Sequence, residues 1–183
     1  MPSFNKLPQK IIAVSVLFVV VLFSCSKSSK KLEKYGSVVS AVMHNDSGVF
    51  RGFSLGDGFK MIQEKEAGKA LEVDSGYVYY EFPIDTMGSF NITYTFDEMG
   101  LVEIQSNVFV TNAANTEEVF NKFKSYFDEY YGSSETKMGF NIWSVPSEKY
   151  GNVLINLGDE SADFTIDKAP GKISVWIYPD KNL

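Results

Sequence analysis

Apolar and polar positions alternate with a period of two over residues 90–96, the pattern of a strand with one buried face. Residues 102–110 continue this pattern, and an aromatic and β-branched run, Tyr77–Phe82, precedes both segments. Between the two alternating segments lies Asp97-Glu98-Met99-Gly100, which is typical of a hairpin turn because Gly100 readily supplies a positive φ. The sequence therefore predicts three consecutive antiparallel strands.

The spacing changes to the helical period after these strands. Seven apolar residues fall on one wide face of a predicted helix, namely Val119, Phe120, Phe123, Tyr126, Phe127, Tyr130 and Tyr131. Asn115 and Glu118 are placed for a variant of the capping box, and Gly132 ends the helix. A shorter helix is predicted over residues 59–66, with Asp57 as its cap. We expect residues 37–43 to form a first strand or only the edge of the domain.

Four more segments have the composition of strands: 140–145, 152–157, 162–167 and 172–178. The predicted order is helix, three strands, helix, four strands. Because no strand is followed at short spacing by a crossover helix and another strand, the pattern favours an antiparallel sheet. We therefore expect an α+β domain with antiparallel sheet and two packed helices. Its halves, 49–111 and 112–183, are read as a degenerate tandem repeat.

The N-terminal segment predicts export. Lys6 and Lys10 precede an almost wholly apolar run, Ile11–Phe23. As a helix this run with Ser24 rises only about 21 Å, against roughly 30 Å of hydrocarbon in a bilayer. A basic start, a short apolar region and a small residue before the cleavage point are typical of a secretory signal. We assign 1–24 to the signal peptide, 25–36 to a tether and 37–183 to the domain.

The motif Leu22-Phe23-Ser24-Cys25 resembles the lipobox of bacterial lipoproteins. The resemblance implies that the Cys25 thiol takes a diacylglyceryl group and becomes the acylated N-terminus, with palmitate among its fatty acids. Ser26, which is not aspartate, implies the outer membrane. The Phe-, Tyr- and Asn-rich composition resembles lipoproteins of the Bacteroidota, but the basic tether, residues 26–31, favours a periplasm-facing protein over surface display. A plain secreted protein and a short membrane anchor stay open as alternatives.

The predicted arrangement is similar to the tandem α/β domains of the β-lactamase-inhibitor-protein type and to small outer-membrane lipoproteins of the SmpA kind. Gly56-Asp57, which leads into a helix ending near Glu66, echoes the helix opening of those proteins. The resemblance implies a binding or assembly module and carries over no functional residue.

Charge and composition limit the ligands and the catalytic groups that we expect of this chain. Without residues 1–24, which hold two of the 17 basic residues, 15 basic residues face 23 acidic ones, a net charge of −8. A chain with this excess of acidic residues is poorly suited to bind nucleic acid, because the phosphates attract clustered Lys and Arg. With Cys25 lipidated, the domain has no thiol for a disulfide, a nucleophile or a zinc site. His44 is the single histidine, so we predict no metal, cofactor or catalytic residue.

One motif nevertheless resembles a nucleophile elbow. Gly52-Phe53-Ser54-Leu55-Gly56 matches G-x-S-x-G ahead of a predicted helix. The hydrolase fold places its histidine after the serine, whereas His44 precedes Ser54. An envelope hydrolase is therefore the third of the functions that we consider.

Aromatic residues define the candidate binding surface. Trp176 and Tyr178 fall on the face of their strand opposite the aliphatic residues. We group them with Tyr77, Tyr79 and Trp143 as a ligand or partner face, the alternative being a second layer of the core. Thr86, within Asp85-Thr86-Met87, resembles an acceptor for O-glycosylation in Bacteroidota. The sequence thus predicts a non-enzymatic, membrane-anchored module that binds a protein partner, with glycan or small-ligand binding through the sheet aromatics as the alternative.

Overall fold

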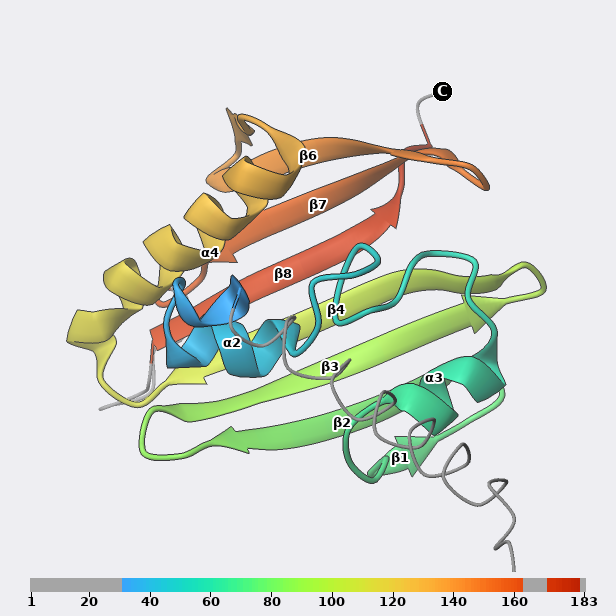
Figure 1. Cartoon of the computed structure of the whole chain (residues 1–183), viewed down its shortest axis with the longest axis horizontal. Coiled ribbons are helices and arrows are strands. Elements are labelled where there is room, and N and C mark those ends of the chain that lie inside the picture. Colours follow the sequence, from blue (N-terminus) through green and yellow to red (C-terminus); the bar gives the residue numbers. More distant parts are fainter. Residues whose placement is uncertain (1–30, 163–170, 182–183) are drawn as a thin grey trace, which may run out of the picture.

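The computed structural model describes residues 31–162 and 171–181, which form an α+β fold with one eight-stranded antiparallel sheet (Figure 1). The helices are α2 (Ser37–Met43), α3 (Phe59–Lys65), the 3₁₀ helix η2 (Ala113–Asn115) and α4 (Thr116–Tyr131). The first four strands are β1 (Glu72–Val73), β2 (Tyr77–Ile84), β3 (Gly88–Asp97) and β4 (Gly100–Val110). The last four are β5 (Glu135–Lys137), β6 (Phe140–Ser147), β7 (Gly151–Asp159) and β8 (Gly171–Pro179).

The sheet has the strand order β1-β2-β3-β4-β8-β7-β6-β5. Most neighbours are consecutive along the chain, but the central pair joins β4 to β8, which are far apart in sequence. Their register runs from Val110, opposite Gly171, to Ile104, opposite Ile177. This pair holds the N-terminal strands and the C-terminal strands in one continuous sheet.

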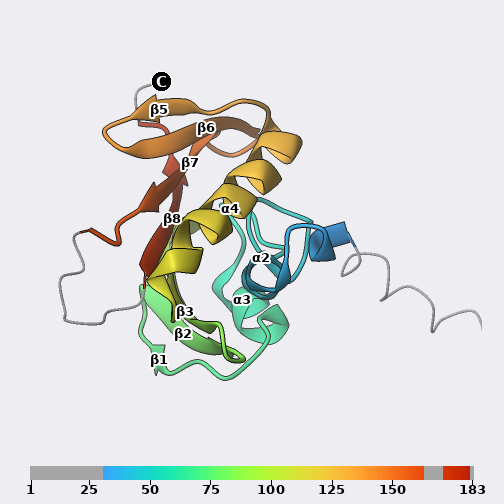
Figure 2. The same ribbon diagram turned by 90° about the vertical axis from the view of Figure 1, so that its left-hand side faces the viewer.

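All three longer helices lie on the same side of the sheet (Figure 2). The strands turn alternate side chains toward them, so that Ile92 of β3, Ile104 of β4 and Val175 of β8 are fully buried. On the opposite side, no helix of the described residues covers the sheet. We call this side the open face. None of the helices among the described residues has both the length and the apolarity needed to span a bilayer.

The predicted long helix is confirmed as α4. Val119, Phe123 and Phe127 are buried against the sheet, and Gly132 follows the helix with a φ of 84°. Asn115 occupies the cap position of α4, as predicted, but the predicted capping hydrogen bond is wrong, because this residue has helical backbone angles and its side chain makes no such bond. Instead, Oδ1 of Asn112 accepts a hydrogen bond from the backbone N–H of Ala114, at 3.0 Å, one turn earlier.

Residues 37–43 form a helix, α2, so the predicted first strand is wrong. Val38, Val39, Val42 and Met43 are all buried, and the spacing of these residues is that of one helical face. Burial of this face outweighs the preference of β-branched valine for strands. Leu32 and Tyr35 are buried as well, so the packed domain begins before residue 37.

The helix predicted after residue 57 is confirmed as α3, but Gly58 precedes it in the cap position. The carboxylate of Asp57 instead accepts a hydrogen bond from the backbone N–H of Ser54, at 2.8 Å. Six predicted strand segments lie within β2, β3, β4, β6, β7 and β8. The short strands β1 and β5 were not predicted. The predicted strand 162–167 lies outside the described residues except for its first residue.

A buried ion pair fastens the helical layer to the sheet. Nη2 and Nε of Arg51 donate to the two carboxylate oxygens of Glu66, at 2.5 and 3.0 Å, and both side chains are almost fully buried. Arg51 also donates to the backbone carbonyls of Ala41 and Val42 at the end of α2. On the sheet, the Tyr94 hydroxyl donates to Glu66. The end of α2, the end of α3 and strand β3 therefore meet at these two side chains.

Candidate functional site

The open face carries rows of side chains that lie next to one another across the strands. One row joins Tyr79 of β2, Thr93 of β3, Gln105 of β4 and Trp176 of β8, each residue paired with the next in the strand register. Neighbouring strands are about 4.8 Å apart, so three strand steps place Tyr79 and Trp176 roughly 14 Å apart. The row thus has an aromatic ring at either end and polar side chains between them.

Trp176 and Tyr178 lie side by side at one end of this row. Their ring centroids are 4.9 Å apart and their planes meet at 53°. The Trp176 side chain is 42% exposed, while Val175 and Ile177 on either side of it in the chain are fully buried. The predicted division of this strand into an aliphatic and an aromatic face is confirmed.

A pocket lies beside these rings where β4 and β8 diverge. Their register ends at Ile104 and Ile177, and the ribbons separate beyond that point (Figure 1). The pocket has a volume of about 610 Å³. We call it the aromatic pocket; it is lined by Thr95, Asp97, Met99, Val102, Glu103, Tyr150, Leu154, Trp176, Tyr178, Pro179, Asp180 and Lys181.

A β-bulge shapes one wall of the aromatic pocket. In the β3–β4 register, Thr95 opposes Glu103 and Phe96 opposes Leu101, so Val102 is an extra residue on β4. A bulge re-aims side chains locally. Val102 and Glu103 therefore both line the pocket although they are consecutive, and Leu101 stays in the core.

Charge in the aromatic pocket is mainly negative. The lining includes the carboxylates of Asp97, Glu103 and Asp180 and the ammonium group of Lys181. Among the described residues, no salt bridge neutralises Asp97 or Glu103. Burial raises the pKa of Tyr150 above its ordinary value, and the negative charge of Asp97 raises it further. The carboxylate of Asp97 therefore acts electrostatically on this wall of the pocket.

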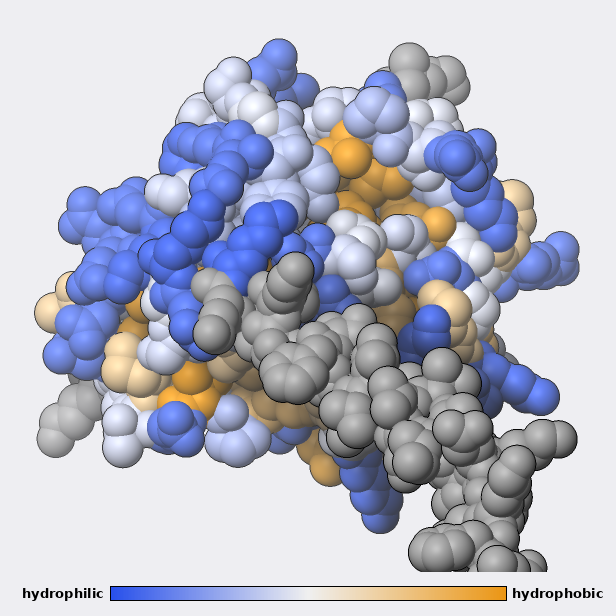
Figure 3. Space-filling model, in the orientation of Figure 1, coloured by the Kyte–Doolittle hydropathy of each residue, from blue (hydrophilic) through white to orange (hydrophobic). Residues whose placement is uncertain are grey.

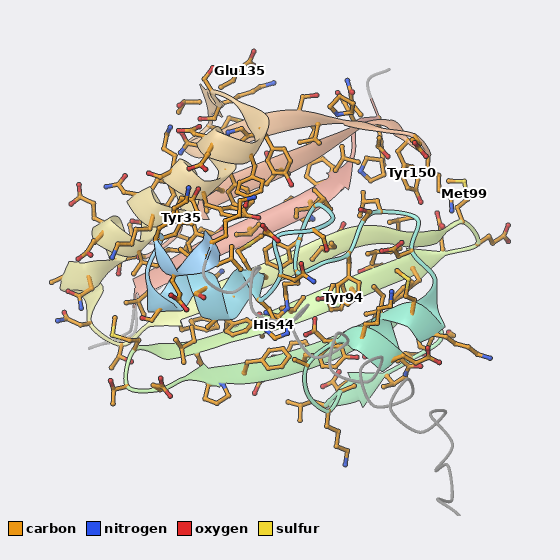
Figure 4. All side chains as sticks on the ribbon, in the orientation of Figure 1. Tyr35, His44, Tyr94, Met99, Glu135 and Tyr150 are labelled. Atoms are coloured by element: carbon orange, nitrogen blue, oxygen red, sulfur yellow. The ribbon has the colours of Figure 1, made fainter. Side chains whose placement is uncertain are left out.

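The β6–β7 turn contacts the β3–β4 hairpin beyond the point where β4 and β8 diverge. The Tyr150 hydroxyl donates to the carbonyl of Leu101 at 3.4 Å, and the Lys149 ammonium donates to the carbonyls of Met99 and Gly56. Figure 4 shows Met99 and Tyr150 at the same end of the sheet, on two different hairpin turns. These contacts hold the pocket walls, which come from distant parts of the sequence, in one place.

A second pocket, of about 470 Å³, lies on the helical side of the same turn. Apolar side chains line much of it, including Leu55, Val145 and Val153, and Figure 3 shows apolar surface in a hollow on this side. Ser54 and Asp57 also line it, from the segment that resembles a nucleophile elbow.

The match of this segment to the nucleophile-elbow motif has a structural explanation. Gly52 and Gly56 have φ values of 91° and 93°. Other residues rarely adopt such angles, so the backbone of these turns requires the two glycines. His44 is exposed at the end of α2 and does not line the pocket with Ser54. Ser54 thus lacks a histidine base in this pocket.

Tyr77 and Tyr79 lie on the open face but not in the aromatic pocket. The Tyr77 hydroxyl donates to Glu72 at 3.1 Å, and the Tyr79 hydroxyl donates to Glu81. The hydrogen bond to Glu72 raises the pKa of Tyr77, whereas burial and then Glu81 raise that of Tyr79. They form a second aromatic and acidic group on the same side of the sheet.

The assignment of Trp143 to the binding face is wrong. Its side chain is only 1% exposed and packs against Phe127 of α4, with ring centroids 5.2 Å apart. The indole N–H donates to the carbonyl of Gly132 at 2.9 Å and to Asp128 at 3.1 Å. Trp143 therefore completes the end of α4 and is not available to a ligand.

The remaining predictions concern Thr86, Cys25 and metal binding. Thr86 is exposed in the turn between β2 and β3, next to Asp85, which has a φ of 42°. Cys25 lies outside the described residues. Within residues 31–162 and 171–181, no three His, Cys, Asp or Glu side chains are grouped to hold a metal ion.

Sequence reasoning missed Asp97, Glu103 and Tyr150. Asp97 is recognisable from sequence only as a turn residue, and alternation alone does not reveal the bulge that turns Glu103 into the pocket. Tyr150 comes from a turn that reaches the site through tertiary contacts. Comparisons of the chain with protein-family models, with curated proteins and with solved structures found no match.

Proposed function

We propose that this chain is a lipid-anchored binding module of the bacterial cell envelope and that it holds its partner on the open face of the sheet. The observation that carries the proposal is the exposed Trp176, paired with Tyr178 above a pocket on a face left uncovered by the described helices. An exposed tryptophan in a concave site provides a large apolar contact at a modest entropic cost.

The groups in the aromatic pocket suit binding better than catalysis. They are aromatic rings, aliphatic side chains and partly exposed carboxylates, such as Glu103. Nucleophilic catalysis needs a nucleophile hydrogen-bonded to a base, and the lining residues offer no such pair. A non-enzymatic role is therefore the first proposal, with a protein as the partner.

Glycan binding is the second candidate, favoured by the row from Tyr79 to Trp176. Its central residues, Thr93 and Gln105, offer a hydroxyl and an amide between two aromatic platforms. Sugars combine ring stacking with hydrogen bonds to such groups.

The proposed anchor is Cys25, supported by the resemblance of Leu22–Cys25 to a lipobox. We infer an outer-membrane location that faces the periplasm. The resemblance to tandem α/β modules supports a degenerate repeat, in which β2–β4 and β6–β8 correspond and meet at the β4–β8 pair. The resemblance of Asp85-Thr86-Met87 to a glycosylation acceptor supports Thr86 as a modification site.

Fatty-acid labelling tests the anchor. The full chain and its Cys25→Ser variant are expressed in a bacterium with intact lipoprotein processing and supplied with radioactive palmitate. We expect label on the unchanged chain alone. Absence of label from both chains would overturn the lipoprotein assignment and the location inferred from it.

Capture from detergent-solubilised envelope tests the face. A component retained by the full chain should be lost with Trp176→Ala and kept with Met138→Ala, because Met138 is 89% exposed but lies outside the aromatic pocket. Equal retention by both variants would contradict binding through Trp176.

A further inference from the structure

We propose that the aromatic pocket receives a cationic group, the ammonium or guanidinium of a Lys or Arg side chain on a protein partner. This inference rests on the proposed function and names the chemistry of the partner at the same site. It depends on two independent features of the pocket, the arrangement of its rings and the sign of its charge.

Two of the rings that line the pocket, Trp176 and Tyr178, are inclined to each other and do not form one flat platform. Trp176 and Tyr178 meet at 53°, with centroids 4.9 Å apart, so their faces form a corner. Tyr150 lines the same pocket from a different turn. A cation placed against such faces is attracted by the negative charge above each ring, and tryptophan offers the strongest attraction.

The carboxylates supply the complementary charge. Glu103 comes from the bulge on β4, and Asp97 from the end of β3, where its Oδ1 accepts the backbone N–H of Met99 at 2.7 Å. Neither carboxylate has a cationic partner among the described residues. By contrast, the carboxylate buried in the core, Glu66, is paired with Arg51. Asp97 and Glu103 are thus able to receive a cation from outside.

The surroundings of the pocket favour a polypeptide as the carrier of the cation. Gln105 and Thr93 continue from Trp176 across the open face and offer hydrogen-bonding side chains to a backbone lying over the sheet. Met99, Val102 and Leu154 line the same pocket and provide apolar contacts for the methylene stem of a lysine or arginine. A bare ion would leave these contacts unused.

Titration with short peptides tests the inference directly. The full chain, in detergent and with Trp143→Phe, keeps Trp176 as its only tryptophan and therefore as the reporter. The probes are tetralysine, the same peptide with acetylated side chains, tetraglutamate and a neutral cello-oligosaccharide. We expect a saturable change in Trp176 emission with tetralysine, weakened by salt, and no matching change with the other three probes.

Charge variants give effects of opposite sign. Glu103→Gln should weaken tetralysine binding about threefold to fivefold, the range of a partly exposed ion pair. Lys181→Gln should strengthen binding, because it removes a competing ammonium group from the pocket. Glu135→Gln is the matched control, since Glu135 is an exposed acid on β5 outside the pocket, and it should leave binding unchanged.

A response to the oligosaccharide or to acetylated tetralysine equal to that for tetralysine would overturn the cationic inference and leave the binding face in place. An affinity for tetralysine that neither Glu103→Gln nor Lys181→Gln changes would also overturn it. The absence of a response to all four probes would also overturn the inference. The proposed function has separate tests, palmitate labelling for the anchor and the comparison of Trp176→Ala with Met138→Ala for the binding face.

Discussion

Arg51 is the residue whose environment departs furthest from what its chemistry predicts. It is 4% exposed, has a φ of 55°, and its guanidinium lies over the rings of Phe82 and Phe90, at 5.0 and 5.3 Å. The bidentate contact with Glu66 neutralises its charge. Burial raises the pKa of Tyr94 well above its ordinary value, and the charge of Glu66 adds to this, so its hydroxyl keeps its proton and donates to the pair.

Breaking this pair from one side should be costly. Glu66→Gln leaves the guanidinium of Arg51 buried without its countercharge, and a loss of about 3–5 kcal/mol in the free energy of unfolding is expected. The paired replacement Arg51→Met with Glu66→Leu should cost less than that single change, because no charge remains in the core. Urea denaturation measures both. A loss below 1 kcal/mol for Glu66→Gln would contradict a structural role for the pair.

Tyr131 predicts how stability depends on alkaline pH. Burial, and then the neighbouring Tyr130, raise its pKa from 10.0 to about 12. Below pH 10 the hydroxyl is protonated in both states. Between pH 10 and 12 the unfolded chain loses this proton first, so the free energy of unfolding should fall as pH rises.

The Tyr131→Phe variant should therefore show a shallower decline between pH 10 and 12, by at most about 1.4 kcal/mol per pH unit. Its stability at pH 8 provides the reference, because there the hydroxyl is protonated in both states. Urea midpoints across the pH series measure the difference. An unchanged slope would show that the Tyr131 hydroxyl titrates alike in the folded and unfolded chains.

At the scale of elements, the spacing of apolar residues and the residues typical of turns predict most strands and the long helix. They cannot predict which distant strands become neighbours. The β4–β8 pair depends on tertiary packing, and the aromatic pocket exists only because these strands diverge beyond Ile104 and Ile177. Alternation placed Trp176 on a face opposite the aliphatic residues, but it could not tell that Trp143 points toward α4. The short helix α2 was missed because its valines also suit a strand.

The β3–β4 turn provides a test of how elements hold the pocket. Gly100 has a φ of 107°, and a Cβ there would lie 2.7 Å from the carbonyl oxygen of Gly56 and 2.8 Å from that of Asp57. Gly139 also has a positive φ, 85°, but a Cβ there meets nothing within 4 Å. It is therefore a control for backbone strain alone.

Gly139→Ala should cost about 1–2 kcal/mol, since it adds only left-handed strain. Gly100→Ala should cost more, because the backbone of residues 56 and 57 must also move. Thermal unfolding of the two variants measures the difference. Equal costs would mean that the close approach between this turn and the segment 56–57 contributes nothing to stability.

At the scale of the whole molecule, the fold separates two surfaces. The described helices cover one side of the sheet, and the opposite side presents Trp176, a polar row and a negatively charged pocket (Figure 2). The composition predicted an acidic domain that does not bind nucleic acid, but only the structure shows where its acidic and aromatic groups meet.

The most direct test asks which side of the sheet touches a partner in intact cells. A photo-crosslinking amino acid is placed on the open face beside Trp176, at Gln105 or Thr93, and on exposed helix positions, at Gln63 of α3 or Asn121 of α4. The account predicts a discrete adduct from the two open-face positions and none from the helices. An adduct formed only from Gln63 or Asn121 would contradict the open face as the binding surface.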